Sequence, residues 1–344
     1  QKYEKTLIAK ISDIPMSGGI TPQHYKVKRY HLRTWREFLT INKLINKPLD
    51  KINPNATKNF GLWLLNKPKQ TATHKQGRSI EVINDTINEI VRMYYQIAKG
   101  NYLTESQLPI LDRLKQRPDD SFKRDILTEV QYEKFWKYLR QKYCAKKHKK
   151  DVDDAELLKR KIFTEFIMII ANVGFRSKEL LGLKVGEISE GEGWDAKKKK
   201  SHIVMKVRKE NSKTGKGRLC VAPVRERVEK VIKHYKDLGI KLDKSDYLFM
   251  NPTSKTRNNY GRMIMYKRLK KVFKDSGLQK EFDAENKLVS IYSFRHQYAC
   301  WRLRFGDVPI HLLAKQMGTS VSKIESTYGH IMVLEQADQI TKNQ

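Results

Sequence analysis

The sequence is poor in cysteine. Its 344 residues include three, Cys144, Cys220 and Cys300, which lie far apart along the chain. They form no CxxC pair and no cluster with histidine, and this spacing argues against a disulfide framework and against a zinc site. We therefore expect reduced thiols in an intracellular protein, and no metal at any site.

Long apolar runs are also missing. The longest, FIMIIA at 166–171, is far shorter than the ~20 apolar residues that a membrane-spanning helix needs. The first residues do not have the pattern of a secretory signal peptide. We therefore expect no membrane contact.

Acidic residues are scarce relative to basic ones. The chain has 38 Asp and Glu against 70 Lys and Arg, a formal net charge of +32 at pH 7. Such an excess repels itself in a compact fold unless a polyanion is the usual partner. Nucleic acid is the favoured partner, because each neutralised phosphate releases counterions. A ribosome-associated protein, or one that is simply basic, is the alternative.

Apolar residues are nevertheless numerous enough for packed cores: 39% of the chain is hydrophobic and 10% aromatic. The length favours two domains. Apolar residues at helical spacing predict helices near 25–45, 56–66 and 81–99, and a polar stretch broken by Pro109 and Pro118 follows. The predicted organisation is a loose lead-in at 1–25, a helical core DNA-binding domain at 26–104, a linker at 105–125, and a catalytic domain with a C-terminal segment at 126–344.

The second domain is expected to be mainly helical with a little β-structure. Residues 162–172 are apolar on nearly every side, which is typical of a helix inside a core. Two short strands, near 203–208 and 219–224, flank the turn NSKTGKG and predict a β-hairpin with a basic tip. The fold class is therefore predicted as mainly α with a small β-hairpin or sheet (α+β).

Two arginines stand out by their surroundings. Arg176 begins a helix after a Gly-Phe turn, and Glu179, three residues on, is placed to hold it by a salt bridge. Arg295 lies among apolar and aromatic residues in YSFRHQYA, so we expect it to be partly buried. A buried arginine needs a partner, and a structural carboxylate and a substrate phosphate are equally good candidates.

A lysine and a tyrosine complete the candidate set. Lys213 lies in the turn SKTGKGR, where a flexible lysine can protonate a leaving oxygen, and Lys216 competes for that role. Tyr328 is one of 16 tyrosines. Taken singly, each is more often an ordinary residue, the lysine a solvated cation and the tyrosine a structural aromatic.

Four segments together resemble a known family. GFRSKELLGL, SKTGKGR, YSFRHQYA and MGTSVSKIESTY are similar, in order and spacing, to the motif boxes of the tyrosine recombinases, the phage integrase family. The resemblance implies that Arg176 and Arg295 are the two catalytic arginines, Lys213 the hairpin lysine and Tyr328 the nucleophile.

The same resemblance assigns supporting roles. Tyr292 stands where the family most often has histidine in His-x-x-Arg, and Thr319 stands where a second histidine is usual. Hydroxyl groups still donate to phosphate oxygens, but they shuttle protons less well than histidine near neutral pH. The supporting residues predicted are Tyr292, Thr319, His296 and Glu179, and the predicted DNA contacts are Lys216, Arg218, His74, Lys75 and Arg78.

The activity implied is site-specific DNA recombination. The enzyme would cleave and rejoin DNA through a 3′-phosphotyrosyl intermediate, without metal or ATP, to integrate or excise a mobile element. The partners implied are double-stranded attachment sites, a homo-tetramer that exchanges C-terminal segments such as 331–344, and accessory DNA-bending or directionality factors. A cytoplasmic, nucleoid-associated protein from a bacterial, phage or other mobile-element source is expected.

Two other functions share these features. A topoisomerase IB-like nicking-closing enzyme uses the same chemistry without exchanging partners. A catalytically silent DNA-binding relative would keep the fold without the reaction. The helical N-terminal domain and the short stretch of sequence between Arg176 and Tyr328 favour a recombinase over a topoisomerase-like enzyme. The presence of all four motif residues favours a recombinase over a silent DNA-binding relative.

Overall fold

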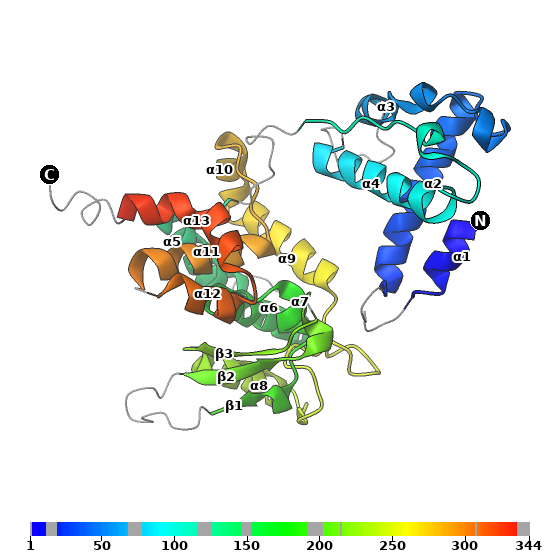
Figure 1. Cartoon of the computed structure of the whole chain (residues 1–344). Helices are drawn as coiled ribbons and strands as arrows, with labels where there is room; N and C mark the ends of the chain where they lie inside the picture. The colour runs from blue at the N-terminus through cyan, green and yellow to red at the C-terminus, as the bar shows by residue number, and fades with distance from the viewer. Residues whose placement is uncertain are drawn as a thin grey trace, which may run out of the picture. The chain divides into compact units, whose positions relative to one another are not determined.

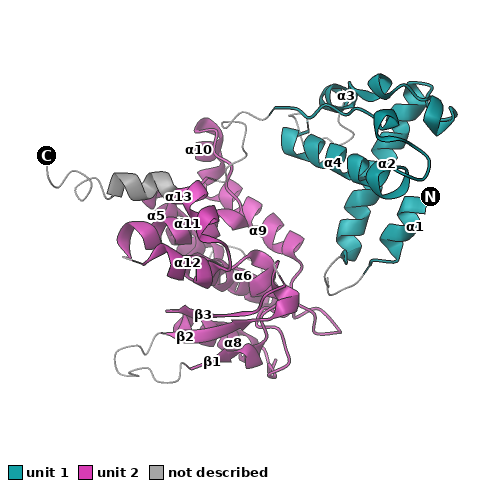
Figure 2. Ribbon diagram, in the orientation of Figure 1, with its two compact units in different colours: residues 1–122 teal, residues 123–344 magenta. Residues whose placement is uncertain are grey.

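The computed structural model describes residues 2–11, 19–67, 78–115, 125–145, 153–190, 202–213, 215–306 and 308–335, the last seven of them as backbone only. The chain forms two compact units, residues 1–122 and 123–344 (Figure 2). Helices predominate in both units, and the second also contains a small sheet (Figure 1). Across these ranges, no helix combines the length and apolar character that crossing a bilayer requires.

The first unit is helical throughout its described part. Its core combines aromatic and aliphatic side chains, with Trp35 packed edge-on against Phe60 at a centroid distance of 4.9 Å. Hydroxyl caps fix two helix starts, because Thr21 accepts a bond from the His24 N–H and Ser79 one from the Val82 N–H. The helices are α1 (Lys2–Ile8), α2 (Pro22–Ile41), α3 (Phe60–Asn66) and α4 (Ile80–Ile97), with 3-10 turns at Leu49–Lys51, Pro54–Thr57 and Glu105–Gln107.

The expectation of a loose lead-in at 1–25 is wrong for its described residues. Residues 2–8 form α1, and both Tyr3 and Leu7 are buried. The Tyr3 hydroxyl donates to Glu89 of α4 at 2.8 Å, and Lys28 of α2 forms an ion pair with the same carboxylate. Because a buried carboxylate needs such partners, this network fastens α1 to the first unit.

The predicted linker also begins later than expected. Leu108 is buried in the core of the first unit, and the backbone of Leu114 exchanges two hydrogen bonds with the Asn84 side chain, at 2.9 and 3.0 Å. Residues 105–115 therefore pack as part of the first unit. The rest of the predicted linker, up to residue 124, lies outside the described residues.

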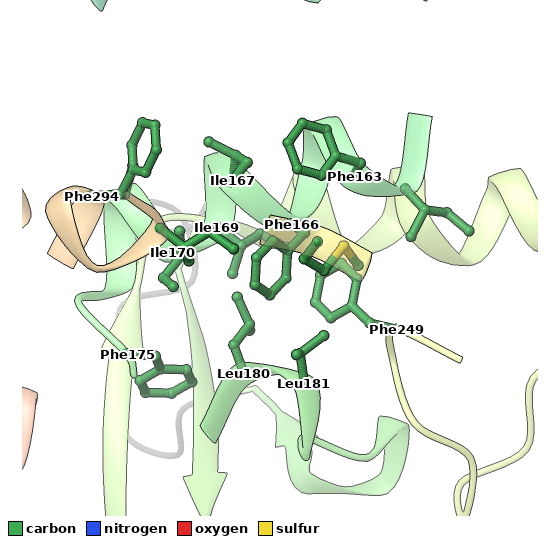
Figure 3. Packing of buried hydrophobic residues seen from close by; sticks show 14 of the residues in the cluster. Phe163, Phe166, Ile167, Ile169, Ile170, Phe175, Leu180, Leu181, Phe249 and Phe294 are labelled. Carbon is green, nitrogen blue, oxygen red and sulfur yellow. The ribbon is translucent and has the colours of Figure 1, made fainter. Parts of the chain in front are cut away.

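The second unit is organised around α6 (Asp154–Val173). Thirteen of its residues are buried, and Figure 3 shows its Phe166 and Ile170 among side chains of other segments, such as Phe249 and Phe294. This confirms the prediction of a core helix at 162–172. The other helices are α5 (Glu129–Tyr138, extended by a π-helical turn at Leu139–Tyr143), α7 (Ser177–Leu181), α8 (Arg225–Lys236), α9 (Arg262–Asp275), α10 (Leu278–Ala284), α11 (Ile291–Phe305), α12 (Ile310–Met317) and α13 (Val321–Glu335), with 3-10 turns at Val185–Glu187 and Lys209–Asn211.

A three-stranded antiparallel sheet completes the second unit. Its strands are β1 (Ile188–Ser189), β2 (Ile203–Val207) and β3 (Arg218–Ala222), in the order β1-β2-β3. Met205 of β2 lies opposite Cys220 of β3, and both are buried. The predicted hairpin is therefore present, and the fold class is α+β with helices dominant, as expected. The sequence pattern did not reveal β1.

Candidate active site

The site begins where α6 ends. Gly174 closes α6 in a left-handed conformation (φ +72°), and the Cβ of any other residue there would lie 2.4 Å from the Tyr298 ring. Arg176 then caps α7: its backbone N–H and its Nη1 donate to Glu179 at 2.9 and 2.8 Å. The expected salt bridge is present, and it holds the guanidinium in one orientation.

Glu179 is shared by a second arginine. Its side chain is fully buried and also accepts bonds from Arg218 Nη2 and Nη1, at 2.7 and 3.1 Å. Burial raises the pKa of Glu179, but the bonds from Arg218 and Arg176 outweigh it and hold that pKa below its usual value. Arg218, predicted as a DNA contact, instead points inward and fixes this carboxylate.

The turn after α12 joins the same network. Arg176 Nη2 donates to the Gly318 carbonyl at 3.0 Å, and Arg218 Nε donates to the Gln316 carbonyl at 3.1 Å. Gly318 adopts φ +64°, and a Cβ there would lie 2.5 Å from the Arg218 guanidinium. Thr319 follows, half-buried, with its N–H bonded to the Ala314 carbonyl. The network therefore places Thr319 directly after a carbonyl that Arg176 binds.

Gln316 also fastens α12 to the sheet. Its side-chain amide accepts from the Val221 N–H at 3.1 Å and donates to the Val221 carbonyl at 2.8 Å. A side-chain amide that pairs with both backbone groups of one residue reproduces the bonding of a neighbouring strand. The hairpin and the Met-Gly turn are thus held together.

Arg295 lies on α11 and is 3% exposed. Its Nη1 donates to the Gly174 carbonyl at 2.6 Å, and within the described residues it forms no ion pair. Burial lowers the pKa of Arg295, and the charge of Arg176 lowers it further. The sequence left two partners open for Arg295, a structural carboxylate and a substrate phosphate. Within the described residues, no carboxylate binds Arg295.

These groups carry an excess of positive charge. Arg176 and Arg218 bind Glu179, and all three act electrostatically on Arg295, so the set combines three guanidinium groups with one carboxylate. Two positive charges in this set are left without a negative partner. A phosphodiester carries one negative charge, and the transition state of its displacement carries two, so the set suits that transition state.

Tyr328 lies on α13 and is 6% exposed. Its hydroxyl is 2.6 Å from Nδ1 of His296 on α11. Burial raises the pKa of Tyr328, Cys300 and Tyr292 raise it further, and the charge of Arg295 opposes them. Tyr292 is 45% exposed, and its ring meets the His296 ring edge-on at a centroid distance of 4.8 Å.

The remaining predicted residues are not gathered at this cluster. Lys213 and Lys216 are exposed in the hairpin turn, and Lys213 makes no hydrogen bond or ion pair within the part of the chain that the structure describes. Arg78 bonds to the Tyr30 hydroxyl at 2.8 Å and to the Leu64 carbonyl at 3.3 Å, inside the first unit. His74 and Lys75 lie outside the described residues, as does most of the C-terminal segment predicted at 331–344.

Sequence reasoning missed two residues of the network, Gln316 and Gly318, and the structural role of a third, Arg218. The Met-Gly step was visible as a turn, but its partners lie 95 to 142 residues earlier in the chain and no local spacing connects them. The described residues contain no grouping of three or more His, Cys, Asp or Glu side chains that could hold a metal ion.

Two comparisons place this arrangement among known proteins, and a third found nothing similar. The phage integrase family profile matches residues 125–333, more than half of the chain. A comparison with curated protein sequences gave no match.

Several solved structures share the fold. The XerH recombinase in a post-cleavage complex with a palindromic difH substrate has a TM-score of 0.60 and 14% identity, covering 93% of this chain and 80% of that one. A lambda integrase dimer bound to a COC′ core site has a TM-score of 0.60 and 14% identity, with coverage of 95% and 94%. The Tn1549 transposon integrase with transposon right end DNA gives 0.58 and 17%, with 98% of each chain covered. The family match and the shared fold agree with the four motif segments: the chain belongs to the phage integrase family and is a tyrosine recombinase.

Proposed function

We propose that Arg176, Arg295, Tyr328 and Lys213 carry out DNA strand cleavage and rejoining in this chain. The observation that supports this most directly is the convergence of three elements. These elements carry Arg176 at the start of α7, Arg295 on α11 and Tyr328 on α13. The charge of Arg176 lowers the pKa of Arg295, and the charge of Arg295 in turn opposes the rise in the pKa of Tyr328. Titratable groups that shift one another's pKa in this way are typical of functional sites.

Each group has a distinct role in the proposed reaction. Tyr328 attacks the scissile phosphate, forming a Tyr–O–P bond as the bond from phosphorus to the 5′ oxygen breaks. Arg176 and Arg295 bind the non-bridging oxygens, on which negative charge builds in the transition state. Lys213 supplies a proton to the departing 5′ oxygen, and its place on an exposed turn leaves it able to reach bound DNA.

The 3′-phosphotyrosyl bond retains the energy of the phosphodiester. The freed 5′-hydroxyl of a partner strand therefore reverses the step and exchanges the strands without ATP. Because arginines neutralise the phosphate and tyrosine supplies the nucleophile, we expect no metal to be needed. We further propose a homo-tetramer on two attachment sites, with accessory DNA-bending or directionality factors that assist it, to integrate or excise a mobile element.

The test is capture of the covalent intermediate. Duplexes are first selected from a random-sequence pool by their binding to the Tyr328→Phe protein. They are then synthesised with a single nick moved along one strand, so that cleavage releases a short fragment and traps the protein on DNA. Wild type should give a covalent band on denaturing electrophoresis in the presence of EDTA, and Tyr328→Phe should give none.

The outcomes separate the remaining alternatives. If wild type binds tightly but forms no band with any nick, the chain is a silent DNA-binding relative. If it forms the band and relaxes supercoils but never joins two different duplexes, it is a nicking-closing enzyme. A band that survives in Tyr328→Phe would assign the nucleophile to another residue. A band that EDTA abolishes would contradict the metal-free mechanism.

A further inference from the structure

The contact between Tyr328 and His296 is not explained by phosphate binding or by protonation of the leaving oxygen. The phenol oxygen of Tyr328 lies 2.6 Å from Nδ1 of His296, at the short end of the range for a hydrogen bond between side chains. The two rings are tilted, with centroids 5.4 Å apart. The imidazole therefore meets the nucleophilic oxygen through a ring nitrogen, which can accept a proton.

The position of His296 on α11 couples it to the phosphate site. Tyr292, Arg295 and His296 are spaced i, i+3 and i+4, so they share one face of the helix. The turn of helix that presents the Arg295 guanidinium to a phosphate thus also presents the imidazole to Tyr328. The edge-on contact with the Tyr292 ring helps to keep the imidazole in that orientation.

A proton acceptor is needed at this point. Burial raises the pKa of Tyr328, and the opposing charge of Arg295 does not cancel the effect. The phenol therefore attacks efficiently only if another group takes its proton during the attack. Tyr292, which stands where the motif resemblance places histidine, is itself a phenol and accepts protons poorly near neutral pH.

We propose that His296 is the general base of the cleavage step and takes the proton of Tyr328 through Nδ1. The proposal rests on the function proposed above. As the Tyr328 oxygen bonds to phosphorus, its proton passes to His296, while the leaving 5′ oxygen receives a proton from Lys213. In rejoining, the attacking 5′-hydroxyl gives its proton back to Lys213, and His296 returns its proton to Tyr328 as the phosphotyrosyl bond breaks. No further reactant is needed.

Three variants test the assignment with the nicked duplexes, in single-turnover assays of covalent-complex formation. His296→Ala should slow cleavage by ~100-fold or more, the usual size of a general-base contribution. His296→Asn places an amide oxygen near the position of Nδ1, so it can accept the Tyr328 hydrogen bond but cannot take up the proton. It should be about as slow as His296→Ala. Tyr292→Phe keeps the ring that packs against His296 and removes only the hydroxyl, so it should slow cleavage less than either His296 variant.

Added imidazole gives an independent readout. It should restore a concentration-dependent part of the cleavage rate to His296→Ala, because it can occupy the vacated space and accept the proton. It should not accelerate the wild type. If His296 only positions Tyr328, His296→Asn will cleave at nearly the wild-type rate and imidazole will have no effect, and the proposal is wrong. Loss of cleavage in Tyr292→Phe, with His296→Asn active, would instead make Tyr292 the proton acceptor.

A modified substrate separates the two proton transfers. Sulphur in place of the bridging 5′ oxygen makes a leaving group that needs no proton. The sulphur substrate should therefore rescue Lys213→Ala but leave His296→Ala and His296→Asn slow. Rescue of the His296 variants would place His296 on the leaving-group side and overturn the proposal. If wild type itself formed no Tyr328-dependent covalent band, the proposed function would be wrong. The rates of the His296 variants test only the proton transfer, so no result with them would contradict the proposed function.

Discussion

At the scale of single residues, Glu179 has the largest structural role in the site. Its carboxylate is fully buried and is bound by Arg176 and Arg218, which come from α7 and β3. Breaking a buried ion pair by removing one partner costs more than forming it gains, because the other charge stays buried and unpaired. Glu179 therefore controls the orientation of an arginine that we expect to bind the scissile phosphate.

We predict that Glu179→Gln lowers the free energy of unfolding by about 1.5–3 kcal/mol at neutral pH, the range for a hydrogen bond to a charged group. The matched control is Glu190→Gln. Glu190 also pairs with an arginine, Arg225, but its side chain is 80% exposed, so we expect a change below about 1 kcal/mol. Denaturant unfolding measures both, and equal effects would contradict the importance given to burial.

The lowered pKa of Glu179 also predicts a pH dependence. A carboxylate with a lower pKa in the folded than in the unfolded state stabilises the fold above its unfolded pKa. That stability is lost as the pH falls below about 4.5 and through the folded pKa, because the carboxylate becomes protonated. The difference in unfolding temperature between wild type and Glu179→Gln should shrink over this range in thermal melts. A constant difference would show that the charge of Glu179 does not contribute.

Residue-level features were predictable only where partners are close in sequence. The pair Arg176–Glu179 follows from helical spacing. The second partner of Glu179, Arg218, is 39 residues away, so local pattern alone suggested a surface cation at the end of a basic turn. Similarly, the motif resemblance indicated that His296 belongs to the site, but only the packing of α11 against α13 shows which atom it contacts.

At the scale of elements, the turn between α12 and α13 controls the geometry of the arginines. Gly318 combines a left-handed backbone with an approach to the Arg218 guanidinium that leaves no room for a Cβ. Its carbonyl also receives the bond from Arg176. A change in this turn therefore moves both arginines.

We predict that Gly318→Ala destabilises the protein by more than about 1 kcal/mol and slows covalent-complex formation, since it adds a steric clash to the cost of the left-handed backbone. Gly239→Ala is the control. Gly239 has a similar φ of +72°, but nothing lies within 4 Å of its added Cβ. It should therefore cost about 1 kcal/mol and leave cleavage unchanged. Equal rates for the two variants would contradict the role given to the turn.

Elements with a strong pattern of their own were predictable. The core helix α6 and the hairpin β2–β3 follow from apolar runs and alternation. Helix α1 was missed because Gly-Gly and prolines nearby suggested a loop, whereas Tyr3 and Leu7 are held by contacts with residues much later in the chain. The start of the linker was misplaced for the same reason, since Leu108 is buried by partners outside its own segment.

At the scale of the whole molecule, the net charge of +32 is the dominant property. We predict that affinity for the selected duplex falls about 10³–10⁵-fold between 50 and 200 mM salt, the range for a protein that neutralises about 6–10 phosphates. Tyr328→Phe should show the same dependence, because its hydroxyl carries no charge when protonated. Fluorescence anisotropy titrations measure both. A shallow dependence in wild type would show that most of the charge faces away from the DNA.

The pairing of Gln316 with Val221 also affects the tendency of the protein to aggregate at high local concentration. β3 is an edge strand of its sheet, and an open strand edge invites pairing with the same strand of another molecule. The Gln316 amide is hydrogen-bonded to both the N–H and the carbonyl of Val221. At that residue, the strand edge is therefore already paired and cannot bond to a second copy in the same way. A contact that fastens the active-site turn to the sheet thus also discourages aggregation where DNA concentrates the protein.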